Sequence, residues 1–370
     1  MRTELCRTLG IEFPIVAFSH CRDVVAAVSN AGGLGVLGIS GTTVEQLDRE
    51  LTWIEDTVGG RPYGVDVLLP APATGAPVPI EDLLPMAHKE FVADLLARYG
   101  VPPLPDPGST RTVSGAMAAH GAALIEAALE HRVALVASAL GPPPPEMVAL
   151  AHDRGVPVAA LVGKREHAER QRDAGVDIIV AQGYEAGGHV GEIGTMVLVP
   201  EIVDAVAPLP VLAAGGIASG RQLAAALALG AQGAWTGSVW LTTSEAETHP
   251  AVVEKFLQAT SSDTIRSRAS TGKPARQLRS AWTDEWEDPA HPDPLPMPLQ
   301  IVLTADARAR IQRGAHTPDS GAHKLINYFV GQVVGSLNTV RPARHVLLDM
   351  VEEYVEVVER LAAATRGSAD

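Results

Sequence analysis

Eight short apolar runs recur through the first part of this chain, and they constrain its fold more than any other feature. They span residues 11–18, 34–39, 63–69, 133–138, 156–162, 177–181, 211–214 and 233–236. Runs this short and uniformly apolar are typical of parallel strands that are buried on both faces. Most are separated by alanine-rich stretches with helical periodicity. Eight such units within about 240 residues predict an α/β fold of the (β/α)₈ or TIM-barrel type.

The placement of glycine distinguishes this barrel from the main alternative fold, a doubly wound sheet. A doubly wound sheet usually carries its glycine-rich turn after the first strand. Here the glycines follow the last three runs, and Gly215-Gly216 and Gly237-Ser238 close the final two. In a phosphate-binding barrel, such ends offer backbone N–H groups to one phosphate, and the dipole of the next helix, residues 219–229, adds to them.

A candidate site also follows the sixth run, in the sequence QGYEAGGHVG. Gly187 and Gly188 let the backbone approach a bulky ligand, and His189 places a titratable group on the same rim. The residues alone are equally consistent with a glycine-rich turn that exposes one histidine. We expect the loop to continue without helix as far as Pro200.

Composition excludes several classes of protein. The formal net charge of −14 argues against a nucleic-acid binder, which needs clustered Lys and Arg. Cys6 and Cys21 have no CxxC spacing and the histidines have no ligand-type spacing, so we expect reduced cysteines and no metal site. With neither a signal peptide nor a membrane-spanning stretch in the sequence, we expect a soluble cytoplasmic protein.

Two regions interrupt the strand–helix rhythm. The first, residues 70–112, is rich in Pro and Gly around one expected helix at 85–99, and we expect a lid or an oligomer contact on the barrel rim. The second, residues 261–318, carries Lys273, Arg276 and Arg279 in an acidic protein, which indicates an anionic ligand or a salt-bridged structural loop. We therefore expect a barrel over residues 1–250 and a substrate-domain or lid segment, with C-terminal helices packing on the barrel, over residues 251–370.

These motifs together resemble the nitronate monooxygenase family, formerly called 2-nitropropane dioxygenases, and the related flavin-dependent enoyl-acyl carrier protein reductases. The resemblance also includes LGIEFPIVAFS, NAGGLGVLG, YGVDVLL and TGKPARQLRSAWTDEW, so it covers most of the chain. It implies an enzyme that binds FMN, without a metal, and that acts on a small molecule.

The family's flavin contacts fall on residues that follow strands one, three, six, seven and eight. They are Ala17, Phe18, Ser19, Asp66, Gln182, Gly183, Gly188, Gly215, Gly216, Gly237 and Ser238. Two positions depart from the family pattern. Asp66 stands where relatives often have Asn, and GSVW replaces GTRF after the eighth strand, so an arginine is missing from the expected phosphate site.

The resemblance also implies a catalytic role for His189, in proton abstraction or in substrate orientation, with a pKa near the ordinary value of about 6.5. His20, Lys273 and Arg276 are further substrate-binding candidates. Three functions follow: an alkyl nitronate monooxygenase using O₂, an NAD(P)H-dependent oxidoreductase of an unsaturated acyl-CoA or other acyl thioester, and a non-catalytic FMN- or phosphate-binding barrel. A homodimer is compatible with each.

Overall fold

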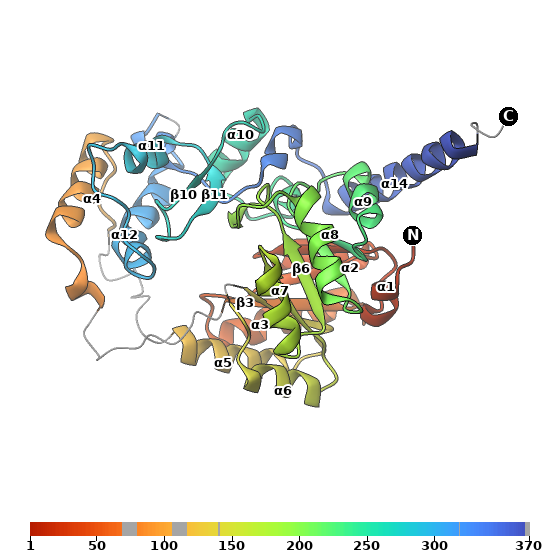
Figure 1. Ribbon diagram of the computed structural model, residues 1–370. Coiled ribbons are helices and arrows are strands. Elements are labelled where there is room, and N and C mark those ends of the chain that lie inside the picture. Colours follow the sequence, from red (N-terminus) through yellow and green to blue (C-terminus); the bar gives the residue numbers. More distant parts are fainter. Residues whose placement is uncertain (69–79, 106–116, 140, 318, 367–370) are drawn as a thin grey trace.

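The barrel predicted from the apolar runs is present in the computed structural model, which describes residues 1–68, 80–105, 117–139, 141–317 and 319–366 (Figure 1). Eight parallel strands close in the order β1-β2-β3-β4-β5-β6-β8-β9, and β9 pairs with β1. They are β1 Ile15–Ser19, β2 Leu34–Gly38, β3 Tyr63–Leu68, β4 Leu135–Ala139, β5 Val158–Val162, β6 Ile178–Gln182, β8 Val211–Ala214 and β9 Gly233–Thr236. The fold is a TIM barrel.

Successive side chains of each strand point alternately into the barrel and out toward the helices, and the inward ones fill the barrel. Val16, Leu34, Ile178 and Leu212 belong to an inner cluster, whereas their chain neighbours, such as Ile15, pack outward against the helices. Helix α1 (Glu4–Leu9) adds Leu5, Cys6 and Leu9 to the inner cluster. It lies at the N-terminal end of the strands, where the Leu5 N–H donates to Gln232 just before β9. The floor is therefore sealed, and the opposite end is left for a site.

A ring of helices surrounds the strands: α2 Arg22–Asn30, α3 Val44–Val58, α5 Met117–Ala128, α6 Pro145–Asp153, α7 Arg165–Asp173, α8 Thr195–Val206 and α9 Gly220–Ala228. Local sequence explains their ends. Helix α3 begins at a capping box formed by Thr43 and Gln46, and it ends at Gly59 in the left-handed conformation.

Two sequence-based boundaries were wrong. The first strand begins at Ile15 and not at residue 11, because the N–H groups of Glu12 and Phe13 both donate to the carbonyl of Gly32 instead of to a strand. Helix α8 begins at Thr195, so the loop after His189 ends before Pro200, which lies inside the helix. Proline disfavours a helix interior, and for that reason the sequence predicted a longer loop.

A second group of elements lies beside the C-terminal end of the barrel (Figure 1). It contains the 3₁₀ turn η1 (Ile80–Leu83), α4 (Met86–Arg98), α10 (Pro250–Gln258), β10 (Thr264–Ser267), β11 (Ala275–Leu278), α11 (Ala281–Glu287), α12 (Leu299–Gly314), α13 (Gly321–Leu325) and η4 (Gln332–Ser336). Helix α4 packs against α12, so the described part of the excursion after β3 joins the C-terminal segment. Residues 69–79 and 106–116 of that excursion lie outside the described residues.

Two elements tie this group to the barrel. Strand β7 (Gly188–His189) leaves the barrel and pairs antiparallel with β11, which in turn pairs with β10. The last helix, α14 (Ala343–Arg366), returns to pack on α9 and α2. Within the described residues, no helix is both long and apolar enough to cross a membrane.

Candidate active site

A cavity of about 1010 Å³ opens at the C-terminal ends of the barrel strands. Its size is at the upper limit of ordinary small-molecule sites, which leaves room for a cofactor together with a substrate. Most of the predicted site residues line it: Phe18, Ser19, His20, Asp66, Gln182, Gly188, His189, Gly215, Gly216, Gly237, Ser238 and Lys273. The structure therefore brings together residues that lie more than 200 positions apart in the sequence.

The glycines after β8 and β9 have the properties of an anion cradle. Gly215 and Gly216 adopt φ values of +97° and +73°, which side chains rarely tolerate. Gly237 has an ordinary φ of −132°, so conformation does not require glycine there. A Cβ on Gly237 would come no closer than 4.0 Å to Phe18, so the space in front of its backbone is open. Ser238 Oγ accepts a hydrogen bond from the Gly331 N–H at 2.8 Å, which leaves its O–H available to a ligand.

The helix that follows Gly216 does not contribute to this cradle, contrary to the sequence-based expectation. The N–H of Gly220, at the start of α9, donates to Glu353 Oε2 at 2.7 Å, and Arg221 Nε pairs with Glu353 Oε1 at 2.6 Å. Glu353 comes from α14, and its carboxylate already satisfies the positive end of the α9 dipole. A ligand phosphate is thus left with the glycines and Ser238.

Two of the predicted flavin contacts lie outside the cavity lining. Ala17 is fully buried in the outer cluster, because successive strand residues face opposite sides and Phe18 takes the inward position. Gly183 faces α8, where an added Cβ would lie 2.1 Å from Thr195 Oγ1. The glycine at 183 is explained by that close approach of α8, and Gln182 is the residue of this pair that reaches the cavity.

His189 is neutral over most of the pH range and is hydrogen-bonded to Thr271. Its Nε2 lies 2.9 Å from Thr271 Oγ1, which in turn lies 3.2 Å from the Lys273 carbonyl oxygen. The neutral imidazole donates to the Thr271 hydroxyl when its proton is on Nε2, and accepts from it when the proton is on Nδ1. Burial, with a smaller effect from the Lys273 charge, lowers the pKa of His189 to about 4, well below the expected 6.5.

Asp66 presents a carboxyl group to the same cavity. Burial raises its pKa to about 8, so it is mostly protonated at neutral pH. A protonated carboxyl group can donate one hydrogen bond and accept another, as the amide of the Asn that relatives often carry would do. The departure from the family pattern at this position therefore preserves the donor–acceptor character of the site.

The three cations of the basic loop do not form a cluster. Lys273 is exposed on the cavity rim. Arg276 is only 2% exposed and lies outside the lining, with Nε donating to the Tyr184 carbonyl and its guanidinium 4.3 Å from the Tyr184 ring. Arg279 pairs with Asp284 at 2.7 Å. The sequence left open an anionic ligand or a salt-bridged structural loop. Arg279 forms a structural salt bridge, and Arg276 is packed against Tyr184, so neither is placed to bind an anionic ligand in the cavity.

Sequence reasoning missed the part of the wall that comes from the C-terminal segment. Tyr328, Phe329 and Gly331 line the cavity, although their positions follow no glycine motif. Gly331 fits tightly, since an added Cβ would lie 2.6 Å from the Glu185 carbonyl. Glu185 itself accepts hydrogen bonds from the N–H and hydroxyl of Thr195, and so it fixes the loop after β6. No local pattern could have revealed these contacts, because they join segments distant in sequence.

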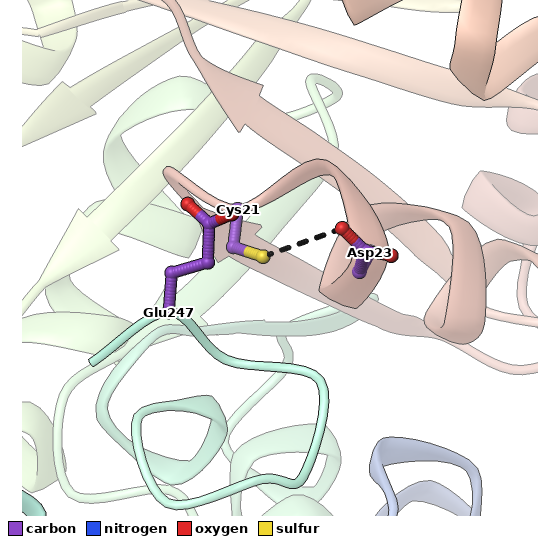
Figure 2. A group of neighbouring side chains, drawn as sticks. All are labelled: Cys21, Asp23 and Glu247. Atoms are coloured by element: carbon purple, nitrogen blue, oxygen red, sulfur yellow. Dashed lines mark hydrogen bonds between the residues drawn. The ribbon is translucent and has the colours of Figure 1, made fainter. Parts of the chain in front are cut away.

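One group of side chains outside this cavity has metal-ligand chemistry. Ligand-type atoms of Cys21, Asp23 and Glu247 lie within 4.8 Å of one another (Figure 2). Burial raises the pKa of the Cys21 thiol, and the thiol donates to the Glu245 carbonyl at 3.1 Å. A protonated thiol is a poor metal ligand, so we assign no metal to this group.

Residues 2–353 match the family model of nitronate monooxygenase. The chain belongs to the nitronate monooxygenase family. The matched region includes the barrel, the segment that completes the cavity wall and the first part of α14, residues 343–353. Members of this family are flavin-dependent oxidoreductases, and the chain is accordingly an enzyme of that class. This sets aside the non-catalytic alternative.

Relatives and solved structures agree with the family assignment. A Mycobacterium tuberculosis protein named as a monooxygenase is 59% identical over 369 residues, which is 98% of either chain. Nitroalkane oxidase from Streptomyces ansochromogenes has a TM-score of 0.81 at 28% identity, covering 96% of this chain and 99% of that one. FabK from Thermotoga maritima has a TM-score of 0.73 at 27% identity, covering 98% and 99%.

Proposed function

We propose that this enzyme is an FMN-dependent nitronate monooxygenase, which uses O₂ to oxidise an alkyl nitronate to a carbonyl compound and nitrite. The observation that carries the proposal is the neutral His189, hydrogen-bonded to Thr271 on the wall of a cavity with an open glycine cradle. The family name and the similarity to a nitroalkane oxidase favour a nitro compound as the substrate.

The residues present fit FMN. Gly215, Gly216 and Gly237 would hold its phosphate through backbone N–H groups, with the Ser238 hydroxyl as a further donor. Asp66 and Gln182, lower in the cavity, offer donors and acceptors to the rest of the cofactor. When bound, FMN supplies the redox chemistry by taking electrons from the substrate and passing them to O₂.

His189 and Lys273 would act on the substrate. A nitronate is an anion, and the exposed Lys273 ammonium on the cavity rim attracts it. A nitronate has no proton to remove and its oxygens accept hydrogen bonds, so His189 would orient it by donating from Nδ1 while Nε2 accepts from Thr271. A neutral nitroalkane, in contrast, must lose a proton, and Nδ1 of the other neutral tautomer can accept it.

Anaerobic mixing tests the substrate class. Flavin absorbance is followed after the addition of an alkyl nitronate, of NADH or NADPH, or of an unsaturated acyl thioester. We expect rapid bleaching with the nitronate alone. Bleaching by a nicotinamide, followed by reoxidation with the acyl thioester, would replace this proposal with the reductase alternative.

A His189→Ala variant tests the proton-transfer role. We expect FMN to be retained, because the proposed phosphate anchors lie on other loops. Oxidation of a neutral nitroalkane should fall by about 10²- to 10⁴-fold, the usual contribution of a general base. Oxidation of the preformed nitronate should fall much less. Equal losses with both substrates would assign His189 to orientation alone, and no loss with either would remove it from the reaction.

A further inference from the structure

A second cavity of about 500 Å³ lies between the barrel rim and helix α12. Its lining includes Ser19, His20, Trp240, Leu241 and Tyr328, all of which also line the flavin cavity. The two cavities are therefore neighbours that share one wall. None of the sequence motifs or the predicted cofactor contacts accounts for the remainder of this second cavity.

Most of the second cavity is apolar. Val252, Trp282, Ile301, Ala305, Leu325 and Ile326 contribute to its surface. A lining of this kind suits an aliphatic chain, since burying apolar surface of the ligand is favourable. Polar side chains line the rest, among them His249, Gln312 and Asn327.

Arg308 is the exception, because it brings an uncompensated positive charge to this lining. Within the described residues the Arg308 guanidinium has no ion pair and no hydrogen bond. Glu247 is the only carboxylate among the described lining residues, and it does not pair with Arg308. Arg308 keeps part of its surface exposed, at a cavity that is partly open to solvent, and burial of the rest lowers its pKa.

An arginine without a partner at the edge of an apolar cavity can bind an oxyanion through two parallel hydrogen bonds, which are strong because both partners are charged. Arg308 lies beside Tyr328, whose hydroxyl loses solvation in the same place. We infer that the second cavity binds the anionic end of an aliphatic ligand, with a carboxylate or a phosphate ester on Arg308 and the chain along the apolar lining. The chain of a longer ligand extends past Tyr328 toward the flavin cavity, so the second cavity is the tail site, which holds the end of the substrate far from the flavin. This step rests on the proposed function.

Calorimetric titration of the purified protein tests the anion site directly. The probes are hexanoate, hexyl phosphate and hexan-1-ol, which share a chain and differ in the head group. We expect one or both anions to bind and the alcohol to bind at least 10-fold more weakly, as the loss of a charge-assisted hydrogen bond implies. The two anions distinguish a carboxylate ligand from a phosphate ester. Equal binding of the alcohol, or no binding of either anion up to about 10 mM, would overturn the inference.

Variants on one helix locate the binding. Arg308→Met should weaken anion binding about 10- to 100-fold, and Arg308→Lys should weaken it less. Arg313→Met is the matched control, since Arg313 is an exposed arginine of α12 outside the cavity lining. Ala305→Leu should reduce binding of all three probes by filling the cavity without changing its charge. Anion binding to Arg308→Met at the parent affinity would contradict the assignment.

The link to the flavin cavity has a separate readout. Dodecanoate should perturb the visible flavin spectrum, whereas hexanoate should bind without doing so. If dodecanoate binds with no spectral change, the second cavity is an isolated anion site and not the tail of the active site. Flavin content is measured on the same samples, so anion binding by a protein that holds no flavin would contradict the proposed function while leaving the anion site intact.

Discussion

The protonation of His189 depends on two neighbours of different kinds. Thr271 holds the ring through a hydrogen bond to Nε2, and the Lys273 ammonium disfavours the imidazolium through its charge. The larger cause of the lowered pKa, burial, acts independently of both. Because the two neighbours act on different properties of the ring, their effects can be separated by substitution.

Lys273→Met should raise the pKa of His189 from about 4, but only part of the way toward the ordinary value of 6.5, because burial remains. Lys273→Arg keeps the charge and should leave the pKa low. Thr271→Val should remove the hydrogen bond to Nε2 and change the tautomer populations, while Thr271→Ser should leave them as in the parent protein. Nitrogen-15 NMR of the imidazole reports both properties, with His189→Gln to assign the signal. A pKa near 6.5 in the parent protein would contradict this account of the site.

At the scale of elements, the contact between α9 and α14 holds the end of the chain to the barrel. Gly220 allows the two helices to approach, since an added Cβ would lie 2.3 Å from the backbone of Met350 and Tyr354. Glu353 caps the start of α9 in the same place. The close fit at Gly220 and the charge of Glu353 therefore both stabilise the crossing of α9 and α14.

Substitutions at this crossing should destabilise the protein by two routes. Gly220→Ala should lower the free energy of unfolding by about 1–3 kcal/mol, because neither backbone atom can move away without displacing α14. Glu353→Gln should cost about 1 kcal/mol, the usual value of an N-terminal cap. Glu352→Gln is the matched control on the exposed side of α14. Thermal and urea unfolding measure all three, and parent stability in Gly220→Ala would show that the helices are not in close contact in solution.

Elements with strong local patterns were predictable from the sequence. The eight strands follow from their apolar runs, and the start of α3 follows from Thr43 and Gln46. Contacts between distant segments were not predictable. Strand β7 pairs with β11 through Gly188 and Arg276, and no periodicity marks a strand of only two residues. Glu353 lies 133 residues after Gly220, so its capping role has no local signature.

The same distinction applies to the candidate site. The alternation of β1 does not reveal by itself which of Ala17 and Phe18 faces inward, because both are apolar. The glycines after β8 and β9 were identifiable because a positive φ or an open approach restricts the choice of residue. Tyr328 and Phe329 were not, since ordinary aromatic residues carry no signal of a cavity wall.

At the scale of the whole molecule, the cofactor should contribute to stability by mass action. A ligand that binds only the folded state at 100 times its Kd stabilises that state by about 2.7 kcal/mol. We expect FMN to raise the Tm of flavin-depleted protein by several degrees, and riboflavin, which lacks the phosphate, to raise it less. Denaturation of the purified protein should release FMN. Release of FAD, or an equal effect of riboflavin, would show that the glycine cradle does not bind the phosphate.

The capping of α9 by Glu353 also has a consequence for biosynthesis. The partner of the Gly220 N–H is the carboxylate of Glu353, and the wait until it is synthesised is 133 residues long. At a synthesis rate of about 5–20 residues per second, that wait lasts roughly 7 to 27 s. The ribosome has by then delivered all eight strands of the barrel, and during this interval the start of α9 has only its local cap, the Ser219 side chain that accepts from the Gln222 N–H. The N–H of Gly220 therefore gains its partner only when the final helix of the chain has been made.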